Sequence, residues 1–326
     1  MTDKQLGGWN HLPEVPIRVS PFFTWPLDPL AMVKWVVGSW LLITEKLIVL
    51  GISIACLVWF SPTMEQTRAL SLDWIAGIYL RNFLLIFAVA GILHLWFYTF
   101  SKQGQTLRYD SRPLRVKGRQ FTLGGQVRDN MFWTLGSGVF FWTGYEVLML
   151  WGLANGYVPW LSWAANPVWF VALFLLTPLW ESFYFYWIHR LIHVPWIYEH
   201  VHALHHRNVN VGPWSGLSMH PVEHLIYLGS VLIHFLVGAH PLHVIFHLQY
   251  FTLTAVTTHT GYQGLLIKDK NRLALGTFHH QMHHRYFECN YGSLEIPWDK
   301  WFGSFHDGTV AANERMQERR KRIMGP

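Results

Sequence analysis

The stretch FHHQMHHRYFECNYG, from Phe278 to Gly292, places four histidines within six residues. It ends a region, His189 to His284, that holds seventeen of the chain's twenty histidines. Burying a polar ring without a hydrogen bond costs free energy, so packing alone does not explain this concentration. The stretch therefore predicts a site in which several imidazoles share one task.

The histidines of this region recur at helical spacing. The groups are HRLIH (His189, His193), HALHH (His202, His205, His206), HPVEH (His220, His224), HTGY (His259) and HHQMHH (His279, His280, His283, His284). Residues three or four apart share a helical face, so an HxxxH pair can chelate one ion. In HxxHH the adjacent imidazole lies about 100° round the helix, where it can reach a second ion. Two facing HxxHH boxes, one HxxxH and a further histidine therefore predict a cup for two metal ions.

Other histidines are expected to be structural or to meet water. They are His11, His94, His306, His240, His243 and His247. The last three share a helical face, but if that helix continues to His259, His243 lies roughly 24 Å from it at 1.5 Å per residue. That separation is too large for one site.

The composition points to a membrane protein. Of 326 residues, 51% are hydrophobic and 13% are charged, whereas about a quarter are charged in a soluble domain. Four apolar stretches reach the length of about 20 residues that a bilayer crossing needs, and they lie within residues 31–60, 82–100, 131–151 and 167–188. A fifth region, 225–258, is interrupted by GAHP at Gly238 to Pro241 and predicts a hairpin of two helices.

Basic residues predict the orientation. Residues 101–130 contain seven Lys and Arg, and the tail adds Arg315, Arg319, Arg320, Lys321 and Arg322. The positive-inside rule places both termini and the segment after Ile188 in the cytoplasm. The predicted fold is therefore an all-α integral membrane protein, with about four transmembrane helices, a helical hairpin and a histidine-rich cytoplasmic cap. No groove-reading motif suggests a nucleic acid, and the chain's compactness favours a bacterial cytoplasmic membrane over the endoplasmic reticulum.

The ligand type narrows the choice of metal. Imidazole binds iron, copper, zinc and nickel, and nine or ten imidazoles exceed what one ion needs. The two cysteines, Cys56 and Cys289, form no CxxC pair. Two irons in an all-nitrogen shell beside lipid fit the activation of dioxygen.

With these boxes, and with the flanking HPVEH, HTGY, NYG and WDKWFGSF, the chain resembles the fatty acid hydroxylase/sterol desaturase superfamily of membrane non-haem di-iron enzymes. The matching features span Trp180 to Phe305, a little over a third of the chain. One departure is Ala203, where many members carry a basic residue. Another is the absence of a second histidine shortly after His259.

The resemblance implies two iron ions, dioxygen as co-substrate, and a set of metal ligands. These are His189, His193, His202, His205, His206, His259, His280, His283 and His284. A tenth ligand is left open between water, His220, His224 and His279. Zinc can occupy such imidazole sites in purified protein.

Residues near the boxes are expected to support the ligands. Glu181 lies eight residues before His189, close to two helical turns, and an ionisable group at the membrane edge is a functional candidate. We expect it to accept a hydrogen bond from an imidazole N–H; the plainer interpretation is an interfacial glutamate. Asn290, Tyr291 and Asp299 are expected to serve the same shell.

The resemblance implies an enzyme that hydroxylates or desaturates a lipid, such as a sterol, a fatty acyl chain or a polar lipid. Two electrons would come from a separate ferredoxin, cytochrome or reductase, because the sequence shows no GxGxxG before a helix and no clustered cysteines. The alternative is a membrane metal-ion transport or storage protein that uses the same histidines. The implied segments are a polar N-terminal segment (1–30), transmembrane helices with a basic loop (31–165), the catalytic region (166–306) and a basic tail (307–326).

Overall fold

The computed structural model describes residues 8–38 and 44–324. Parts of three predicted segments therefore lie outside the described residues: 1–7 of the N-terminal segment, 39–43 of the first apolar stretch and 325–326 of the tail. For the basic tail residues from Arg319 to Arg322, the helix is described but the side chains are not.

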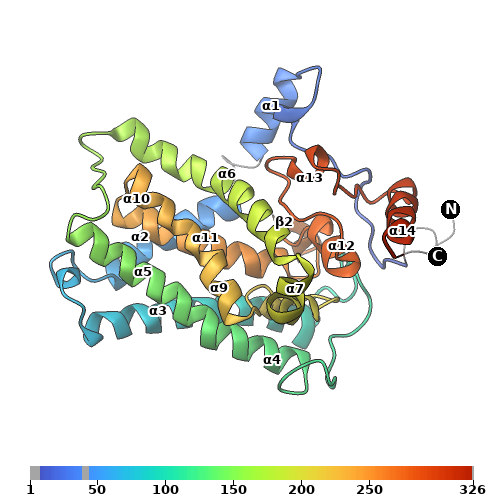
Figure 1. The fold of residues 1–326 in the computed structure, drawn as a ribbon, viewed down its shortest axis with the longest axis horizontal. Helices are drawn as coiled ribbons and strands as arrows, with labels where there is room; N and C mark the ends of the chain where they lie inside the picture. The colour runs from blue at the N-terminus through green and yellow to red at the C-terminus, as the bar shows by residue number, and fades with distance from the viewer. Residues whose placement is uncertain (1–7, 39–43, 325–326) are drawn as a thin grey trace.

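Helices dominate the described chain (Figure 1). The α-helices are α1 (Pro29–Val36), α2 (Glu45–Phe60), α3 (Leu72–His94), α4 (Gln126–Trp133), α5 (Val139–Ala154), α6 (Pro167–Ile192), α7 (Pro195–Ile197), α8 (Ala203–His206), α9 (Pro221–Leu228), α10 (His234–Val237), α11 (Pro241–Thr258), α12 (Phe278–Tyr286), α13 (Trp298–Trp301) and α14 (Val310–Met324). Strands β1 (Gly264–Ile267) and β2 (Lys270–Ala274) pair antiparallel. The all-α prediction missed this small hairpin, which joins α11 to α12.

Two helices in the described chain are long and apolar enough to cross a membrane. They are α3 with its π-helical continuation, Leu72–Thr99, and α6, Pro167–Ile192. In each, only 28% of the most apolar window is buried, and large side chains such as Leu84 and Val168 are exposed. Exposed apolar surface of this extent marks a membrane contact. These two helices indicate membrane association, but the expected four crossings are not confirmed, since no other helix of the described residues is both long and apolar enough.

The predicted hairpin forms where GAHP interrupts the apolar region. Helix α10 ends at Val237, Gly238 adopts a φ of +77°, and α11 begins at Pro241. Positive φ costs a glycine little, so the chain can reverse there. The start of α9 and the end of α11 both reach the histidine-rich end of the molecule, where Glu223 contacts His202 and His259 follows α11.

Helix α11 forms the centre of the core and contacts α2, α3, α5 and α6. Its Val244, Leu248, Phe251 and Val256 are fully buried. A helix that is apolar on all sides is expected in such a position. Because α11 is fixed by four neighbours, its last turn gives His259 a rigid support.

The cap lies at one end of this bundle, where α7, α12 and α13 lie near one another (Figure 1). The N-terminal arm, residues 8–20, packs against α12: the Trp9 ring lies 4.9 Å from Phe278, and the Arg285 guanidinium lies 4.0 Å from the Trp9 ring centroid. These contacts hold the helix that carries the last histidine box.

Candidate metal centre

Nine buried or nearly buried histidines form two groups in the cap. One group contains five, His189, His193, His202, His206 and His283; the other contains four, His205, His259, His280 and His284. Within each group, one nitrogen per ring lies within 4.8 Å of all the others. These are the nine residues proposed as ligands from the sequence, so the fold brings the whole set together.

Adjacent histidines in both HxxHH boxes separate into different groups. In α8, His206 joins the group of five and His205 the group of four; in α12, His283 and His284 divide in the same way. The Nε2 atoms of His206 and His283 lie 3.0 Å apart, which joins the two boxes. The rotation of about 100° per residue that was expected to serve two ions is therefore realised.

Hydrogen bonds from Nδ1 fix several rings. The Nδ1–H groups of His189, His259 and His283 donate to backbone carbonyls, those of Tyr291 at 2.6 Å, Ala255 at 2.6 Å and Cys289 at 2.7 Å. With Nδ1 protonated, the neutral ring carries its lone pair on Nε2. The Nε2 lone pairs therefore point into the groups. In metal-bound histidines, a hydrogen bond from the other ring nitrogen fixes the ring in the same way.

Facing lone pairs give these groups the arrangement that a bound cation requires. Nε2 of His259 lies 3.0 Å from Nε2 of His280 and 3.0 Å from Nε2 of His284. Burial lowers the pKa of His205 to about 4 and lowers the pKa of His284 well below 6.5, so both rings are neutral near pH 7. Neutral imidazole is the form that binds a transition metal. The donor set therefore fits one ion in each group.

A carboxylate that the sequence analysis missed supports the group of five. The Nδ1–H of His202 donates to Oε1 of Glu223 at 2.7 Å, and Glu223 is 3% exposed. Glu223 belongs to the HPVEH motif, in which only His220 and His224 were considered as metal ligands from the sequence. The sequence does show a glutamate between two histidines of one helix, but the spacing along the chain does not indicate that this glutamate contacts His202.

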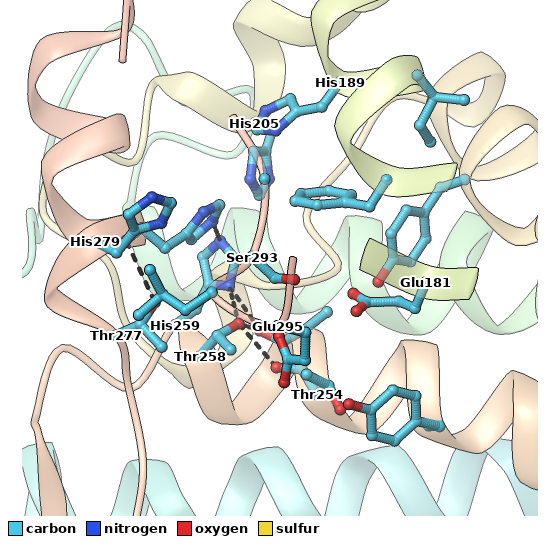
Figure 2. Close-up of a pocket in the computed structure, with 18 of the residues that line it drawn as sticks. Glu181, His189, His205, Thr254, Thr258, His259, Thr277, His279, Ser293 and Glu295 are labelled. Atoms are coloured by element: carbon cyan, nitrogen blue, oxygen red, sulfur yellow. Dashed lines mark hydrogen bonds between the residues drawn. The ribbon is translucent and has the colours of Figure 1, made fainter. Parts of the chain in front are cut away.

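Glu181 does not take the role expected for it. Within the described residues its carboxylate makes no hydrogen bond to an imidazole, and it instead lines the cavity beside the histidines (Figure 2). The geometry gives the imidazole-accepting role to Glu223. Glu181 is buried, with 7% of its surface exposed.

Asp299 and Asn290 brace the loop that follows α12. Asp299 accepts hydrogen bonds from the backbone N–H of Tyr291 and of Gly292, both at 2.8 Å. Tyr291 in turn accepts the bond from His189 through its carbonyl. Asn290 donates to the carbonyls of His279 and His306. Both side chains therefore support the histidines indirectly, because they bind the backbone that contacts or carries these rings and not the rings themselves.

The histidines considered for a tenth ligand lie outside both groups. Nδ1 of His220 accepts from the backbone N–H of Val222 and caps α9. His224 is bonded at both nitrogens, to the Ser137 hydroxyl and the Leu217 carbonyl. Nε2 of His279 lies 3.7 Å from Asp299. None of these three histidines belongs to either group, and the identity of a tenth ligand stays a prediction.

The three histidines at the start and in the first turns of α11, which were predicted to be structural, have protein partners. His240 caps α11, His243 bonds the Phe170 carbonyl, and His247 bonds Ser230 and His234. Satisfied polar groups of this kind are usual in a core. The metal-binding pattern therefore does not extend along α11.

A cavity of about 450 Å³ lies against the two groups. Of the grouped histidines, His189, His205 and His259 line it, as Figure 2 shows, together with His202 and His280. Apolar walls come from Phe185, Ile188, Ile226 and Leu294, and the far end is polar. Its volume falls in the range of about 300–1,000 Å³ that small-molecule sites have.

Comparison with known proteins agrees with the histidine boxes. A model of the fatty acid hydroxylase family matches residues 174–304. The chain is 36% identical over 121 residues to a Delta(7)-sterol 5(6)-desaturase of Gibberella zeae, covering 36% of this chain and 37% of that protein. Over 120 residues it is 33% identical to the Delta(7)-sterol 5(6)-desaturase of Saccharomyces cerevisiae, covering 37% and 32%. These matches support placing the histidine region, residues 174–304, in the fatty acid hydroxylase/sterol desaturase superfamily.

The superfamily assignment rests on the histidine region. Over 160 residues the chain is 31% identical to a Delta(7)-sterol 5(6)-desaturase of Schizosaccharomyces pombe, covering 47% of each protein. The chain thus spans less than half of the length of these relatives. No solved structure matches it. The relatives come from eukaryotes and give no support to the bacterial membrane favoured from the sequence.

Proposed function

We propose that the chain is a membrane-bound, dioxygen-dependent di-iron oxidoreductase that hydroxylates or desaturates a lipid. The observation that carries this proposal is the position of two neutral histidine groups against a largely apolar cavity. Iron bound there would supply the oxidising power for an unactivated C–H bond, which protein acid–base groups cannot attack. Zinc in a purified sample would not argue against iron, because imidazoles bind both.

The chain's own residues would position the ions and the substrate. The group of five would hold one iron and the group of four the other, with Glu223 and the Tyr291 carbonyl keeping the rings oriented. Phe185 and Ile188 would exclude water and direct an acyl or sterol skeleton toward the histidines. Asp299 and Asn290 would hold the loop that carries Tyr291.

The substrate class and the electron donor follow from the same proposal. The relatives' printed names concern a sterol, which makes a sterol-like lipid a reasonable first substrate to test. Electrons would come from a separate ferredoxin, cytochrome or reductase. Basic residues of the segment between α3 and α4 would attract an acidic donor.

The expected membrane arrangement remains part of the proposal. Both termini, the basic segment and the cap would face the cytoplasm, with about four crossings in all. The segments 1–30, 31–165, 166–306 and 307–326 are retained as its organisation. Labelling from outside the cell of a cysteine introduced at Ser101 would contradict this orientation.

Metal transport is less well supported by the geometry. Transport ligands are expected near the bilayer midplane on facing helices. Here His189 lies in the last turn of α6, and the other ligands follow that helix in the cap. Ligands at the end of a helix and in the cap suit a permanently bound metal cofactor better than an ion that is transported across the membrane.

Lipid analysis of cells provides the decisive experiment. Cells with and without the gene, grown with iron, should differ in a lipid that has gained one oxygen atom or lost two hydrogen atoms. The matched control is His283→Ala, which removes a ligand nitrogen and should abolish the difference. An unchanged lipid profile, in cells that contain iron-loaded protein and a reductant system, would contradict the proposal.

A further inference from the structure

The end of the cavity away from the histidines is polar and contains one unsatisfied carboxylate. Nζ of Lys46 lies 3.3 Å from Oε1 of Glu295, and the hydroxyl of Thr257 donates to Glu45. Glu181 differs, because its side chain makes no hydrogen bond or ion pair within the described residues, although it is only 7% exposed. A buried polar group without a protein partner requires a ligand or water.

Two hydroxyl groups accompany this carboxylate. Tyr250 and Thr254 are four residues apart on α11, so they share a face, and both line the cavity. Thr254 Oγ1 is buried without a partner, and the Tyr250 hydroxyl makes no hydrogen bond to a described residue. Figure 2 shows Glu181, Glu295 and Thr254 around the same part of the cavity. The polar end thus offers one carboxyl group that can accept a hydrogen bond and two hydroxyl groups that can donate or accept.

The charges there decide which polar group fits. Three glutamates, Glu45, Glu181 and Glu295, face one lysine, Lys46, and the charges that act on Glu181 are those of the other three. An anionic lipid end, such as a carboxylate or sulfate, is disfavoured because the lysine that could pair with it already contacts Glu295. An ammonium group only donates hydrogen bonds, whereas an alcohol both donates and accepts. An alcohol can therefore satisfy Glu181 and a neighbouring hydroxyl together.

We propose that the cavity binds a lipid alcohol whose hydroxyl donates to Glu181 and accepts from Tyr250 or Thr254. Glu181 and His189 are separated by eight residues of α6, or about 12 Å along the helix axis. A lipid held at Glu181 therefore extends its carbon skeleton toward the histidine groups. This inference rests on the proposed function only in assigning the other end of the lipid to the reacting position.

Equilibrium binding to the purified full-length protein tests the inference without turnover. Two series of probes distinguish a sterol from a straight chain: cholesterol, cholestane and cholesterol sulfate, and octadecan-1-ol, octadecane, stearate and octadecylamine. Binding is measured without reductant or dioxygen. Because Glu181 is otherwise left without a partner, the alcohol of at least one series should bind roughly tenfold more tightly than its hydrocarbon and its anion.

Variants then assign this preference to the polar end. Glu181→Leu should weaken alcohol binding about tenfold and leave hydrocarbon binding and iron content unchanged. Tyr250→Phe is the milder second variant and should lower alcohol binding by a smaller factor. The control is Glu65→Gln, a change at an exposed glutamate paired with Arg68 on the loop before α3. Unfolding temperatures verify that each variant is folded.

Several outcomes would overturn the inference: equal binding of alcohol and hydrocarbon, tighter binding of an anion or of octadecylamine, or wild-type alcohol binding by both cavity variants. A failure of the proposed function has a different signature. In that case the alcohol binds through Glu181, but iron-loaded protein supplied with reductant and dioxygen forms no oxidised product.

Discussion

Removal of the Glu223 carboxylate tests how the protein holds its metal ligands. Glu223 Oε1 accepts the Nδ1–H of His202 at 2.7 Å in a site where both side chains are almost fully buried. Without it, Nδ1–H would be left unpaired and the ring could turn away from the group of five. Loss of such an orienting partner typically costs about 10–100-fold in metal affinity, or roughly 1.4–2.7 kcal/mol. We expect this loss for Glu223→Ala.

Glu223→Gln should have a smaller effect, because the amide oxygen can still accept the bond while the charge is lost. The assay loads full-length protein in detergent with iron, adds increasing chelator, and measures the retained iron by elemental analysis. The chelator concentration for half-release should fall most in the alanine variant. Glu199→Ala, at an exposed position in the same cap segment, is the matched control.

A double-mutant cycle separates this role from general destabilisation. In a His202→Ala background, Glu223→Ala should cost little additional metal affinity, since its partner is already absent. The unfolding temperature of the metal-free proteins records any loss of packing. Wild-type iron retention by Glu223→Ala, or full additivity of the two changes, would refute the proposed orienting contact.

Three further predictions concern the metal count, the register of the last box and the response to acid. Active protein should contain about two transition-metal ions per chain, and elemental analysis showing one tightly held ion would contradict the paired groups. His280→Ala should lower activity at least about a hundredfold, whereas His279→Ala, which removes no grouped nitrogen, should weaken it less; the reverse order would mean that the ligand set is wrong by one residue. Burial lowers the pKa of His224 from 6.5 to about 4, so the unfolded chain takes up this proton first, and the free energy of unfolding should fall as the pH drops from 6.5 to 4. This histidine contributes at most about 3 kcal/mol, and His224→Gln should flatten the fall in unfolding temperature over that range.

Local periodicity was sufficient to find the nine grouped histidines. Histidines three or four residues apart share a helical face, whereas adjacent histidines do not, and both spacings can be read directly from the sequence. The division of His205 from His206 follows from the same rule. The contact of Glu223 with His202 could not be found in this way, because it joins α9 to the segment before α8.

The expectation for Glu181 failed for a geometric reason. Eight residues carry the chain about 80° beyond two full helical turns, so the side chains of Glu181 and His189 do not lie in line along α6, although both line the cavity. The carboxylate consequently faces the cavity rather than a ring. An exact count of helical rotation could have shown this, but it could not have shown which helix closes the cavity opposite Glu181.

Apolar length predicted the membrane segments less well than the site. Residues 131–151 read as one span, but the structure begins this helix at the polar residue Gln126 and includes a π-helical turn at Thr134–Gly138. The most buried apolar helix is α11, which four neighbours enclose. Hydropathy alone does not distinguish a helix that faces lipid from one that other helices surround.

The unequal size of the two histidine groups has a consequence for substrate access. Three of the four histidines in the smaller group line the cavity, His205, His259 and His280, but only His189 and His202 of the larger group do so. A metal ion needs an open coordination position to bind a small molecule. The ion with fewer protein ligands would therefore be the one that faces the lipid, and a tenth protein ligand would close that position. His220, His224 and His279 lie outside the group of four, so an ion held there would have four histidine ligands next to this cavity.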